Sequence, residues 1–233
     1  VVVWDTTEMG LLQAGFNDMV VGLRERERIR DMFGRQVGEE VAEQALTEQA
    51  KLGGEAREVA VLFVDIVGST ALAADRDPEE VVQRLNRFFA VVVEVVESSG
   101  GWINKFQGDA ALAIFGAPLP VDDAATCALK AARRLDERLC AEVPELEAGI
   151  GVAFGEAVAG NIGAESRFEY TVIGDPVNEA ARLTDLAKEH TPRVLASAVA
   201  VEQASGDEAK SWDIEGEQTL RGRSEATRLA SPS

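Results

Sequence analysis

The feature that most constrains this chain is an unbroken apolar run from Val59 to Val64, VAVLFV, which ends at Asp65. A strand that is apolar at every position is typical of a sheet covered on both faces. Helical and extended patterns alternate after it. We expect helices over 78–98, 122–140 and 176–189, and strands over 59–64, 102–107, 110–115, 146–154, 156–161, 168–173, 194–197 and 219–229. The order β-α-β-β-α-β predicts an α+β fold with a ferredoxin-like core and extra C-terminal strands.

Turn and cap residues set the boundaries of these elements. Pro78 fits the first turn of the first of these helices, and Gly100–Gly101 follow its end. Gly108–Asp109 is expected at the tip of a hairpin. Asp175 is the predicted N-cap of the last helix, with Pro176 at its first helical position.

The first fifty residues follow a different pattern. Five apolar residues recur at alternating steps of three and four, as in a heptad seam: Met9, Leu12, Phe16, Met19 and Leu23. The stripe changes phase after Leu23. A parallel dimer helix explains five seam positions better than an amphipathic helix packed on its own domain, although both fit. We expect a long dimerisation helix within 1–50, a charged, glycine-containing linker over 51–58 and a catalytic domain over 59–233.

Composition excludes several classes of function. The net charge is −18, whereas nucleic acids and anionic membrane surfaces demand a basic face. A polyphosphate ligand would need metal ions and local cations to overcome this field. A single histidine and two scattered cysteines make a zinc site improbable. No apolar run is long enough to span a bilayer, and the chain starts at Val1, which suggests a fragment of a longer protein.

Two carboxylates stand where strands end. Asp65 follows the buried strand, where an ionised group is costly unless it is paired or binds a metal, and Asp109 lies at the expected hairpin tip. Each also fits an ordinary role, Asp65 as the cap of the next turn and Asp109 as a turn residue. In a β-α-β-β unit, however, the first strand lies beside this hairpin. The two carboxylates could therefore hold hard cations together.

Other polar residues gather at nearby positions. Lys105 lies on the hairpin, although a strand lysine is usually a solvated surface residue. Thr171 ends the strand that leads into the last helix of the core. Asn178 and Arg182 are four residues apart on that helix and share one face, which also fits a routine surface pair. Beside a phosphate, Arg182 could stabilise charge that develops on a phosphoryl group.

Three segments occur in a characteristic order: FVDIVGST around Asp65, NKFQGDA with Lys105 and Asp109, and TVIGDPVNEAAR from Thr171 to Arg182. In this order and spacing they resemble the class III nucleotidyl cyclases, over most of the chain. The resemblance implies that Asp65 and Asp109 bind two Mg²⁺ or Mn²⁺ ions per site. The backbone carbonyl of Ile66 would add a ligand, and Lys105 with Thr171 would recognise adenine.

The resemblance also implies contacts with the sugar and the phosphates of ATP. Asn178 would position the ribose, and Arg182 would stabilise the transition state at the α-phosphate. Arg221 would bind the terminal phosphates, with Arg223 as the fallback. Four further residues are expected to contact the substrate: Phe63, Gly68, Ser69 and Thr70. The last three form a small, flexible turn whose backbone N–H groups could face an anion.

In this family two equivalent active sites lie at a homodimer interface. One subunit supplies the aspartates, and the other supplies the lysine, threonine, asparagine and arginine. The expected reaction is attack of the ribose 3′-oxygen on the α-phosphorus of ATP, which yields cyclic AMP and pyrophosphate. Many members have aspartate in place of Thr171; threonine resembles a bacterial subclass that uses ATP, since a hydroxyl can accept from the exocyclic amine of adenine.

Three alternatives are weighed against an adenylyl cyclase. They are a guanylyl cyclase of the same fold, a non-catalytic nucleotide-binding regulatory module, and a diguanylate cyclase. The glycine-rich tip of the last class is absent, since the hairpin reads Gln107-Gly108-Asp109-Ala110.

The N-terminal helix resembles the second helix of a HAMP signalling domain through its start at Glu8-Met9-Gly10, with a transducing helix over 26–41. This implies a cytoplasmic domain whose parent protein is anchored in the cell membrane by segments upstream of this chain.

Overall fold

The computed structural model describes the whole chain except residues 1–7, 39–40, 43–50, 70–76 and 223–225. The chain forms two compact units, Val1–Ala50 and Lys51–Ser233. Each unit is described by itself.

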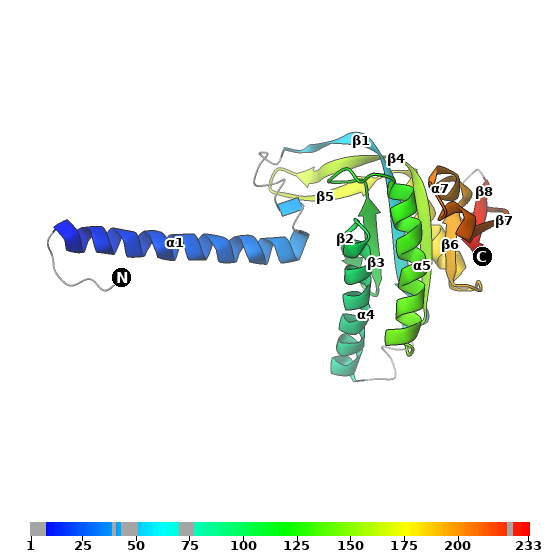
Figure 1. The fold of residues 1–233 in the computed structure, drawn as a ribbon, viewed down its shortest axis with the longest axis horizontal. Helices are drawn as coiled ribbons and strands as arrows, with labels where there is room; N and C mark the ends of the chain where they lie inside the picture. Colours follow the sequence, from blue (N-terminus) through cyan, green and yellow to red (C-terminus); the bar gives the residue numbers. More distant parts are fainter. Residues whose placement is uncertain (1–7, 39–40, 43–50, 70–76, 223–225) are drawn as a thin grey trace. The chain divides into compact units, whose positions relative to one another are not determined.

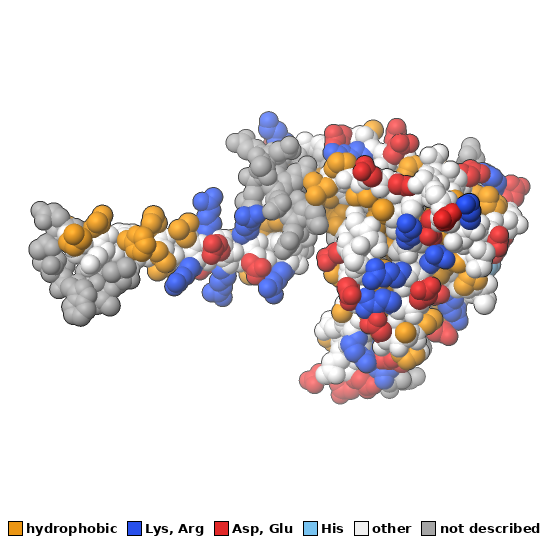
Figure 2. All heavy atoms as spheres, in the orientation of Figure 1, with side chains coloured by type: hydrophobic (Ala, Val, Ile, Leu, Met, Phe, Trp, Pro, Cys, Tyr) orange, Lys and Arg blue, Asp and Glu red, His pale blue; other side chains and the backbone are white. Residues whose placement is uncertain are grey.

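The first unit contains one long helix, α1 (Glu8–Val37). Gly38 follows it with a φ of 91°, a left-handed conformation that commonly ends helices at glycine. Apolar side chains gather on the first part of α1 and charged ones on the later part (Figure 2). Several of the apolar ones are more than half exposed within a single chain: Met9, Leu12, Met19 and Leu23. The predicted helix is confirmed, and its role in dimerisation stays a prediction.

The second unit is built on one mixed sheet with helices on both faces. The strand order is β2-β3-β1-β4-β6-β8-β7, and β5 pairs with β4 outside this path. The strands are β1 (Gly53–Ile66), β2 (Trp102–Gln107), β3 (Ala110–Phe115), β4 (Ala148–Ala164), β5 (Arg167–Ile173), β6 (Val194–Ser197), β7 (Trp212–Thr219) and β8 (Ala226–Pro232). The helices are α4 (Pro78–Ser98), α5 (Ala124–Glu142), α6 (Asp175–Ala187) and α7 (Ala198–Gln203), with a short 3₁₀ turn, η1 (Ala209–Ser211). Figure 1 shows α4 and α5 side by side against this sheet. The order β2-β3-β1-β4 confirms the predicted ferredoxin-like α+β core.

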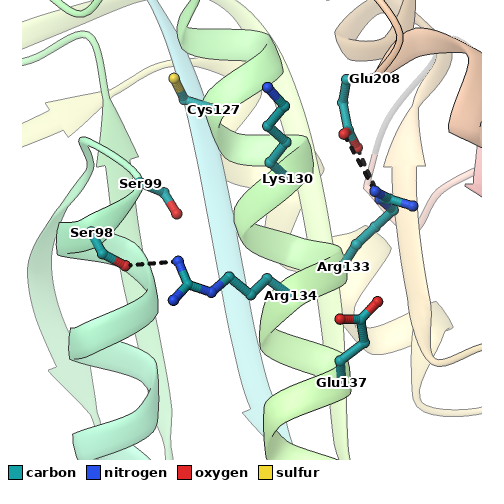
Figure 3. Close-up of a pocket in the computed structure, with 8 residues that line it drawn as sticks. All are labelled: Ser98, Ser99, Cys127, Lys130, Arg133, Arg134, Glu137 and Glu208. Atoms are coloured by element: carbon teal, nitrogen blue, oxygen red, sulfur yellow. Dashed lines mark hydrogen bonds and ion pairs between the residues drawn. The ribbon is translucent and has the colours of Figure 1, made fainter.

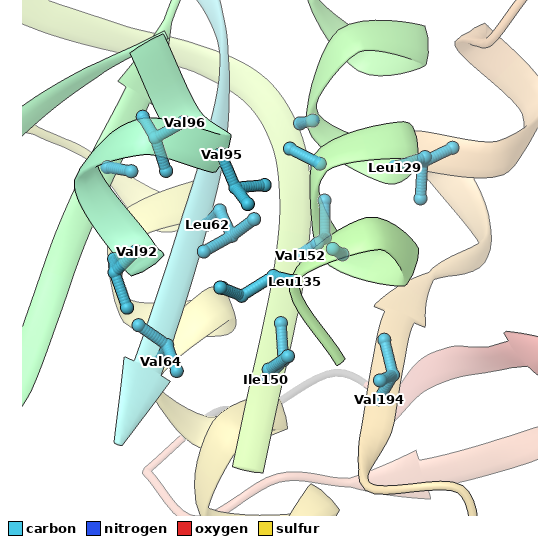
Figure 4. Close-up of a cluster of buried hydrophobic side chains, with 14 of the residues drawn as sticks. Leu62, Val64, Val92, Val95, Val96, Leu129, Leu135, Ile150, Val152 and Val194 are labelled. Carbon is cyan, nitrogen blue, oxygen red and sulfur yellow. The ribbon is translucent and has the colours of Figure 1, made fainter. Parts of the chain in front are cut away.

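Helices α4 and α5 cover one face of the sheet. Every second residue of β1 points into this layer and is at most 2 % exposed: Ala60, Leu62, Val64 and Ile66. They pack with apolar residues of α4, α5 and β4 such as Val92, Leu135 and Ile150 (Figure 4). Burial of one Leu, Ile or Val side chain stabilises a fold by about 1.5–3 kcal/mol. This layer therefore supplies much of the stability of the unit.

Helix α6 packs on the opposite face, and two glycines of β4 let it approach closely. A Cβ atom at Gly151 would lie 2.4 Å from the carbonyl oxygen of Ala180, and one at Gly149 would lie 2.6 Å from that of Thr184. The Thr184 hydroxyl also donates to the carbonyl of Phe63 at 3.1 Å. Because α6 packs directly on the backbone of β4 at these two glycines, its position over β1 and β4 is closely fixed.

The α4 helix and the β2–β3 hairpin have the predicted bounds, whereas three other predictions need correction. β1 begins at Gly53, inside the predicted linker 51–58, because residues 53–58 pair with residues 156–161 of β4. β4 is continuous where the sequence predicts two strands. The strand predicted over 219–229 is correct only at its two ends, because β7 ends at Thr219 and β8 begins at Ala226.

The start of α6 also differs from the prediction. Its N-cap is Gly174, which has no capping side chain, and Asp175 is the first helical residue. A carboxylate in the first turn still interacts favourably with the helix dipole.

Candidate active site

Asp65 and Asp109 meet at one end of the sheet, as the sequence predicts. β1 pairs antiparallel with β3, so that Asp65 lies opposite Ala110, the residue that follows Asp109 at the hairpin tip. Val64 and Ile66 point into the α4/α5 core, so the Asp65 side chain lies on the opposite face, which α6 covers. Alternation along one strand thus brings this carboxylate out of the core and beside the second one.

A lysine that the sequence reasoning missed lies against Asp65. The Nζ atom of Lys188, just beyond α6, lies 2.5 Å from Oδ2 of Asp65. Gly149 makes this possible, because it is the β4 partner of Asp65 and a Cβ atom there would lie 2.7 Å from Cγ of Lys188. No local pattern in the sequence links positions 65 and 188, so only the packing of α6 could have revealed the pair.

The environment raises the pKa of Asp65 above its usual range. Burial is the largest cause, and the neighbouring carboxylate of Asp109 raises the pKa further. The ammonium of Lys188 opposes both effects and favours the ionised form. The site therefore holds two acidic groups and one cation in a partly buried position, an arrangement that a divalent cation would stabilise.

The residues present fit a magnesium or manganese site that water and substrate phosphates complete, rather than a site whose ligands all come from the protein. Among the described residues, no group of three or more His, Cys, Asp and Glu side chains could hold a metal ion. Mg²⁺ commonly binds through one or two carboxylates, with waters and substrate phosphates as the other ligands. Two adjacent aspartates match this pattern. The Ile66 side chain is buried in the core, so only its backbone carbonyl could contribute a ligand.

The turn after β1 contains other predicted substrate contacts. Phe63 is half-buried on the α6 face, Gly68 is exposed with a φ of 68°, and Ser69 is partly buried. A left-handed glycine at this position lets the chain turn sharply after Ile66. Thr70 lies outside the described residues.

Lys105 and Thr171 lie where β2 meets β5. Nζ of Lys105 is 2.6 Å from a carboxylate oxygen of Glu169, and Oγ1 of Thr171 is 3.1 Å from Oδ1 of Asn104. Lys105 pairs with Leu112 of β3, two residues from the Ala110 that faces Asp65, so Lys105 shares the sheet face of Asp65. Each of the two residues thus contacts the other strand, and their role as a base-reading pair stays a prediction.

Asn178 and Arg182 project from the exposed side of α6. The opposite side of the helix, which includes Ala180, Leu183 and Thr184, is buried. The guanidinium of Arg182 lies 3.3 Å from the carboxylate of Asp185. Lys188 follows Arg182 by six residues, so the two side chains leave a helix about 120° apart. Arg182 and Asn178 therefore point away from the aspartates of their own chain.

Arg221 is exposed between β7 and β8, and Arg223 lies outside the described residues. Among the described residues, no hydrogen bond or ion pair joins Arg221 to the other predicted site residues.

A pocket on the other side of the sheet offers no competing site. It has a volume of about 540 Å³ between α4 and α5, and Figure 3 shows Arg133 paired with Glu208 and Arg134 directed at Ser98. Its lining contains none of the predicted site residues. Its two arginines already have partners, so nothing there requires a ligand.

The family of the chain follows from comparison with known proteins. A model of the adenylate and guanylate cyclase catalytic domain matches residues 54–229. The uncharacterized protein Rv1320c of Mycobacterium tuberculosis is 58 % identical over 231 residues, which are 99 % of this chain and 41 % of that protein. The chain thus spans about two fifths of the length of this curated relative.

Solved structures of both kinds of cyclase share the fold. A bacterial light-regulated adenylyl cyclase has a TM-score of 0.81 at 19 % identity, with 97 % of this chain and 66 % of that one covered. The guanylyl cyclase Cya2 has a TM-score of 0.62 at 29 % identity, with 77 % and 93 % covered. The family match over most of the chain leads to one conclusion: this chain belongs to the adenylate and guanylate cyclase catalytic domain family.

Proposed function

We propose that this chain is an adenylyl cyclase that converts ATP to 3′,5′-cyclic AMP and pyrophosphate. The observation that carries the proposal is the meeting of Asp65 and Asp109 at one end of the sheet. Paired carboxylates suit a metal–triphosphate complex, and Lys105 of a second copy would bind the base of the same nucleotide.

Each residue has a distinct part in the proposed reaction. Asp65, Asp109 and the Ile66 carbonyl would hold two Mg²⁺ or Mn²⁺ ions, which when bound lower the pKa of the ribose 3′-hydroxyl and neutralise the departing pyrophosphate. Asn178 positions the ribose so that its 3′-oxygen attacks the α-phosphorus in line. Arg182 donates to the phosphoryl oxygens as the bond to the β-phosphate oxygen breaks.

The remaining residues bind the two ends of ATP. Lys105 and Thr171 hold the adenine. The backbone N–H groups of Gly68 and Ser69 suit the phosphates, and Arg221 would bind the terminal phosphate. Phe63 and Thr70 are expected to contact the substrate beside them.

The proposed sites are shared between two copies of the chain. Asn178 and Arg182 leave α6 on its exposed side, away from Asp65 of the same chain. A second copy related by a two-fold axis can present them to the first copy's aspartates, and symmetry then gives two equivalent sites. This arrangement explains why one chain carries both sets of residues without joining them.

We further infer that α1 strengthens this dimer and belongs to a HAMP-like signalling segment. Its exposed apolar residues support a helix that pairs with a second copy. The curated relatives are more than twice as long as this chain, which supports a catalytic part of a larger protein. The HAMP resemblance alone suggests that this protein is anchored in the membrane with its cyclase in the cytoplasm. In the described residues no helix is both long and apolar enough to cross a bilayer.

The closest alternative is a guanylyl cyclase, because relatives of known fold include both kinds. Thr171 favours ATP, since its hydroxyl can accept from an amine. A regulatory module that binds nucleotide without turnover is the second alternative.

One experiment separates these possibilities. Purified chain with Mn²⁺ is given ATP or GTP in parallel, over a protein dilution series, and cyclic nucleotides are measured by mass spectrometry. We expect cyclic AMP, with a specific activity that falls on dilution as the dimer dissociates. Asp65→Ala and Asp109→Ala should abolish it, whereas Asp213→Ala, which removes an exposed aspartate of β7, should not. Cyclic GMP as the main product, or no turnover, would refute the proposal.

A further inference from the structure

The side chain of Asn104 connects β2 to β5. Its Nδ2 atom donates to the backbone carbonyl of Tyr170 at 3.0 Å, and its Oδ1 atom accepts from the hydroxyl of Thr171 at 3.1 Å. The rings of Trp102 and Tyr170 also approach, with centroids 6.0 Å apart. Asn104 is thus held between one group that only accepts and one that can donate or accept.

These two contacts fix the direction of the Thr171 hydrogen bond. The Tyr170 carbonyl has no hydrogen to donate, so the amide nitrogen of Asn104 must face it. The amide oxygen then faces Thr171, and only the hydroxyl can supply the hydrogen between them. A hydroxyl has one hydrogen and two lone pairs. The Thr171 hydroxyl can therefore only accept hydrogen bonds from any other partner. Because Thr171 is 6 % exposed, water has little access to this hydroxyl and cannot readily replace Asn104 as its acceptor.

A backbone irregularity makes this arrangement possible. The pairing of β2 with β3 shifts register between Ile103 and Lys105. In a regular strand, consecutive side chains point to opposite faces, so Asn104 and Lys105 could not both reach β5. A bulge re-aims a side chain, and here both residues contact β5, Asn104 at Thr171 and Lys105 at Glu169.

We propose that Asn104 is a positioning residue that sets the choice of ATP over GTP by holding Thr171 as a hydrogen-bond acceptor; this rests on the proposed function, in which Thr171 faces the base. Adenine presents an amine, which donates, where guanine presents a carbonyl, which accepts. An ammonium group only donates, and both bases offer it an acceptor, so Lys105 does not distinguish them. Discrimination falls to Thr171, whose lone pairs match the amine and oppose the carbonyl.

The test compares variants of Asn104 with variants of Thr171 in the full chain. Asn104→Leu keeps the approximate size but frees the hydroxyl to rotate and donate. The ratio of kcat/KM for ATP to that for GTP should fall about tenfold, the value of one hydrogen bond of about 1.4 kcal/mol. In a Thr171→Val background, Asn104→Leu should leave the ratio unchanged, because Asn104 acts through the hydroxyl.

A second variant separates specificity from stability. Asn104→Asp places a carboxylate oxygen against the Tyr170 carbonyl, so its Tm should fall, but it still accepts from Thr171 and should keep the ATP preference. Equal loss of ATP and GTP activity in Asn104→Leu, with Tm lowered and the ratio constant, would show a merely structural role. An equal change of ratio in the Thr171→Val background would also overturn the proposal.

Binding of 3′-deoxy-ATP and 3′-deoxy-GTP, which cannot cyclise, distinguishes this idea from the proposed function. A chain without turnover that prefers 3′-deoxy-ATP, and loses the preference in Asn104→Leu, would overturn the cyclase and keep the role of Asn104. If the wild-type chain bound neither analogue, or bound both equally, the proposed role of Asn104 would be overturned.

Discussion

The ammonium of Lys188 lies 2.5 Å from Oδ2 of Asp65, a carboxylate to which the proposed function assigns metal binding. In the single chain this lysine offsets part of the repulsion between Asp65 and Asp109. The contact exists because α6 sits close to Gly149 and extends just far enough to reach β1. We therefore expect Lys188 and a metal ion to compete for the carboxylate of Asp65.

Removal of this competitor should strengthen metal binding. Lys188→Gln keeps most of the length of the side chain without its charge, so the Mn²⁺ concentration for half-saturation should fall by up to about fivefold, as expected for an ion pair of up to about 1 kcal/mol. Titration with Mn²⁺, followed by Tm, measures the shift. Lys210→Gln is the matched control, because Lys210 pairs with Asp207 at 2.7 Å on the surface. Unchanged or weaker Mn²⁺ binding by Lys188→Gln would contradict the competition.

Asp65→Asn should stabilise the metal-free protein while it abolishes catalysis. The raised pKa of Asp65, caused mainly by burial, means that the folded chain holds the proton more tightly than the unfolded chain. Stability is therefore lost as the pH rises from the unfolded pKa through the folded pKa, and asparagine removes that loss. The Tm of the variant should exceed that of the wild type near pH 7, and the difference should shrink as the pH falls toward about 4, the value of an unperturbed Asp.

Activity and stability should change in opposite directions in this variant. Cyclase activity should drop about 100-fold or more, since a lost metal contact removes several kcal/mol of transition-state stabilisation. Thermal melts with and without Mn²⁺ complete the comparison. A lower Tm for Asp65→Asn at neutral pH without metal would show that the burial cost is smaller than the contribution of the Lys188 pair.

Two inactive variants should restore activity when they are mixed. Asp109→Ala lacks a metal ligand, and Arg182→Ala lacks the proposed transition-state group, so each homodimer should be inactive. In a mixed dimer, one of the two sites receives intact residues from both copies. Free exchange of subunits should therefore give about one quarter of wild-type cyclic AMP production. A mixture as inactive as its components, under conditions in which mass spectrometry detects mixed dimers, would rule out shared sites.

The close packing of α6 on β4 makes Gly151 sensitive to substitution, although glycine has no side chain that could take part in catalysis. Gly151→Ala places a methyl group 2.4 Å from the Ala180 carbonyl, so α6 must shift. Overpacking of this kind costs about 1–3 kcal/mol, and a displacement of about 1 Å can lower kcat about 100-fold. Denaturant unfolding and kcat report the two effects. Gly216→Ala in β7, where a methyl group meets no atom within 4 Å, should change neither by a comparable amount.

The elements that the sequence predicts correctly have strong local signals. Asp77 caps α4 through the N–H of Glu79, with Pro78 in the first turn, and the Gly108–Asp109 turn closes the hairpin. Local signals also suffice for the meeting of Asp65 and Asp109, because strand order brings the ends of β1 and of the hairpin together. The start of β1 at Gly53 is harder to predict, since its first residues are polar and exposed and are ordered by pairing with β4.

The missed parts of the site depend on contacts between distant residues. Lys188 reaches Asp65 across 123 positions, and Asn104 reaches Thr171 across 67. The bulge that turns Asn104 toward β5 has no glycine to mark it. Neither a helical nor an alternating pattern records such contacts, because they arise only when the sheet has curved and α6 has docked.

Successive side chains of β1 face opposite sides of the sheet. A deep mutational scan of this strand should therefore separate defects in folding from defects in activity. Substitutions at 60, 62, 64 and 66 affect a layer made only of packed hydrocarbon, and they should lower the yield of folded protein at any nucleotide concentration. Substitutions at 63 and 65 face α6 and the acidic pair, and their defects should appear in the product rather than in the yield. These two sets of positions would thus report two different phenotypes along one segment of backbone.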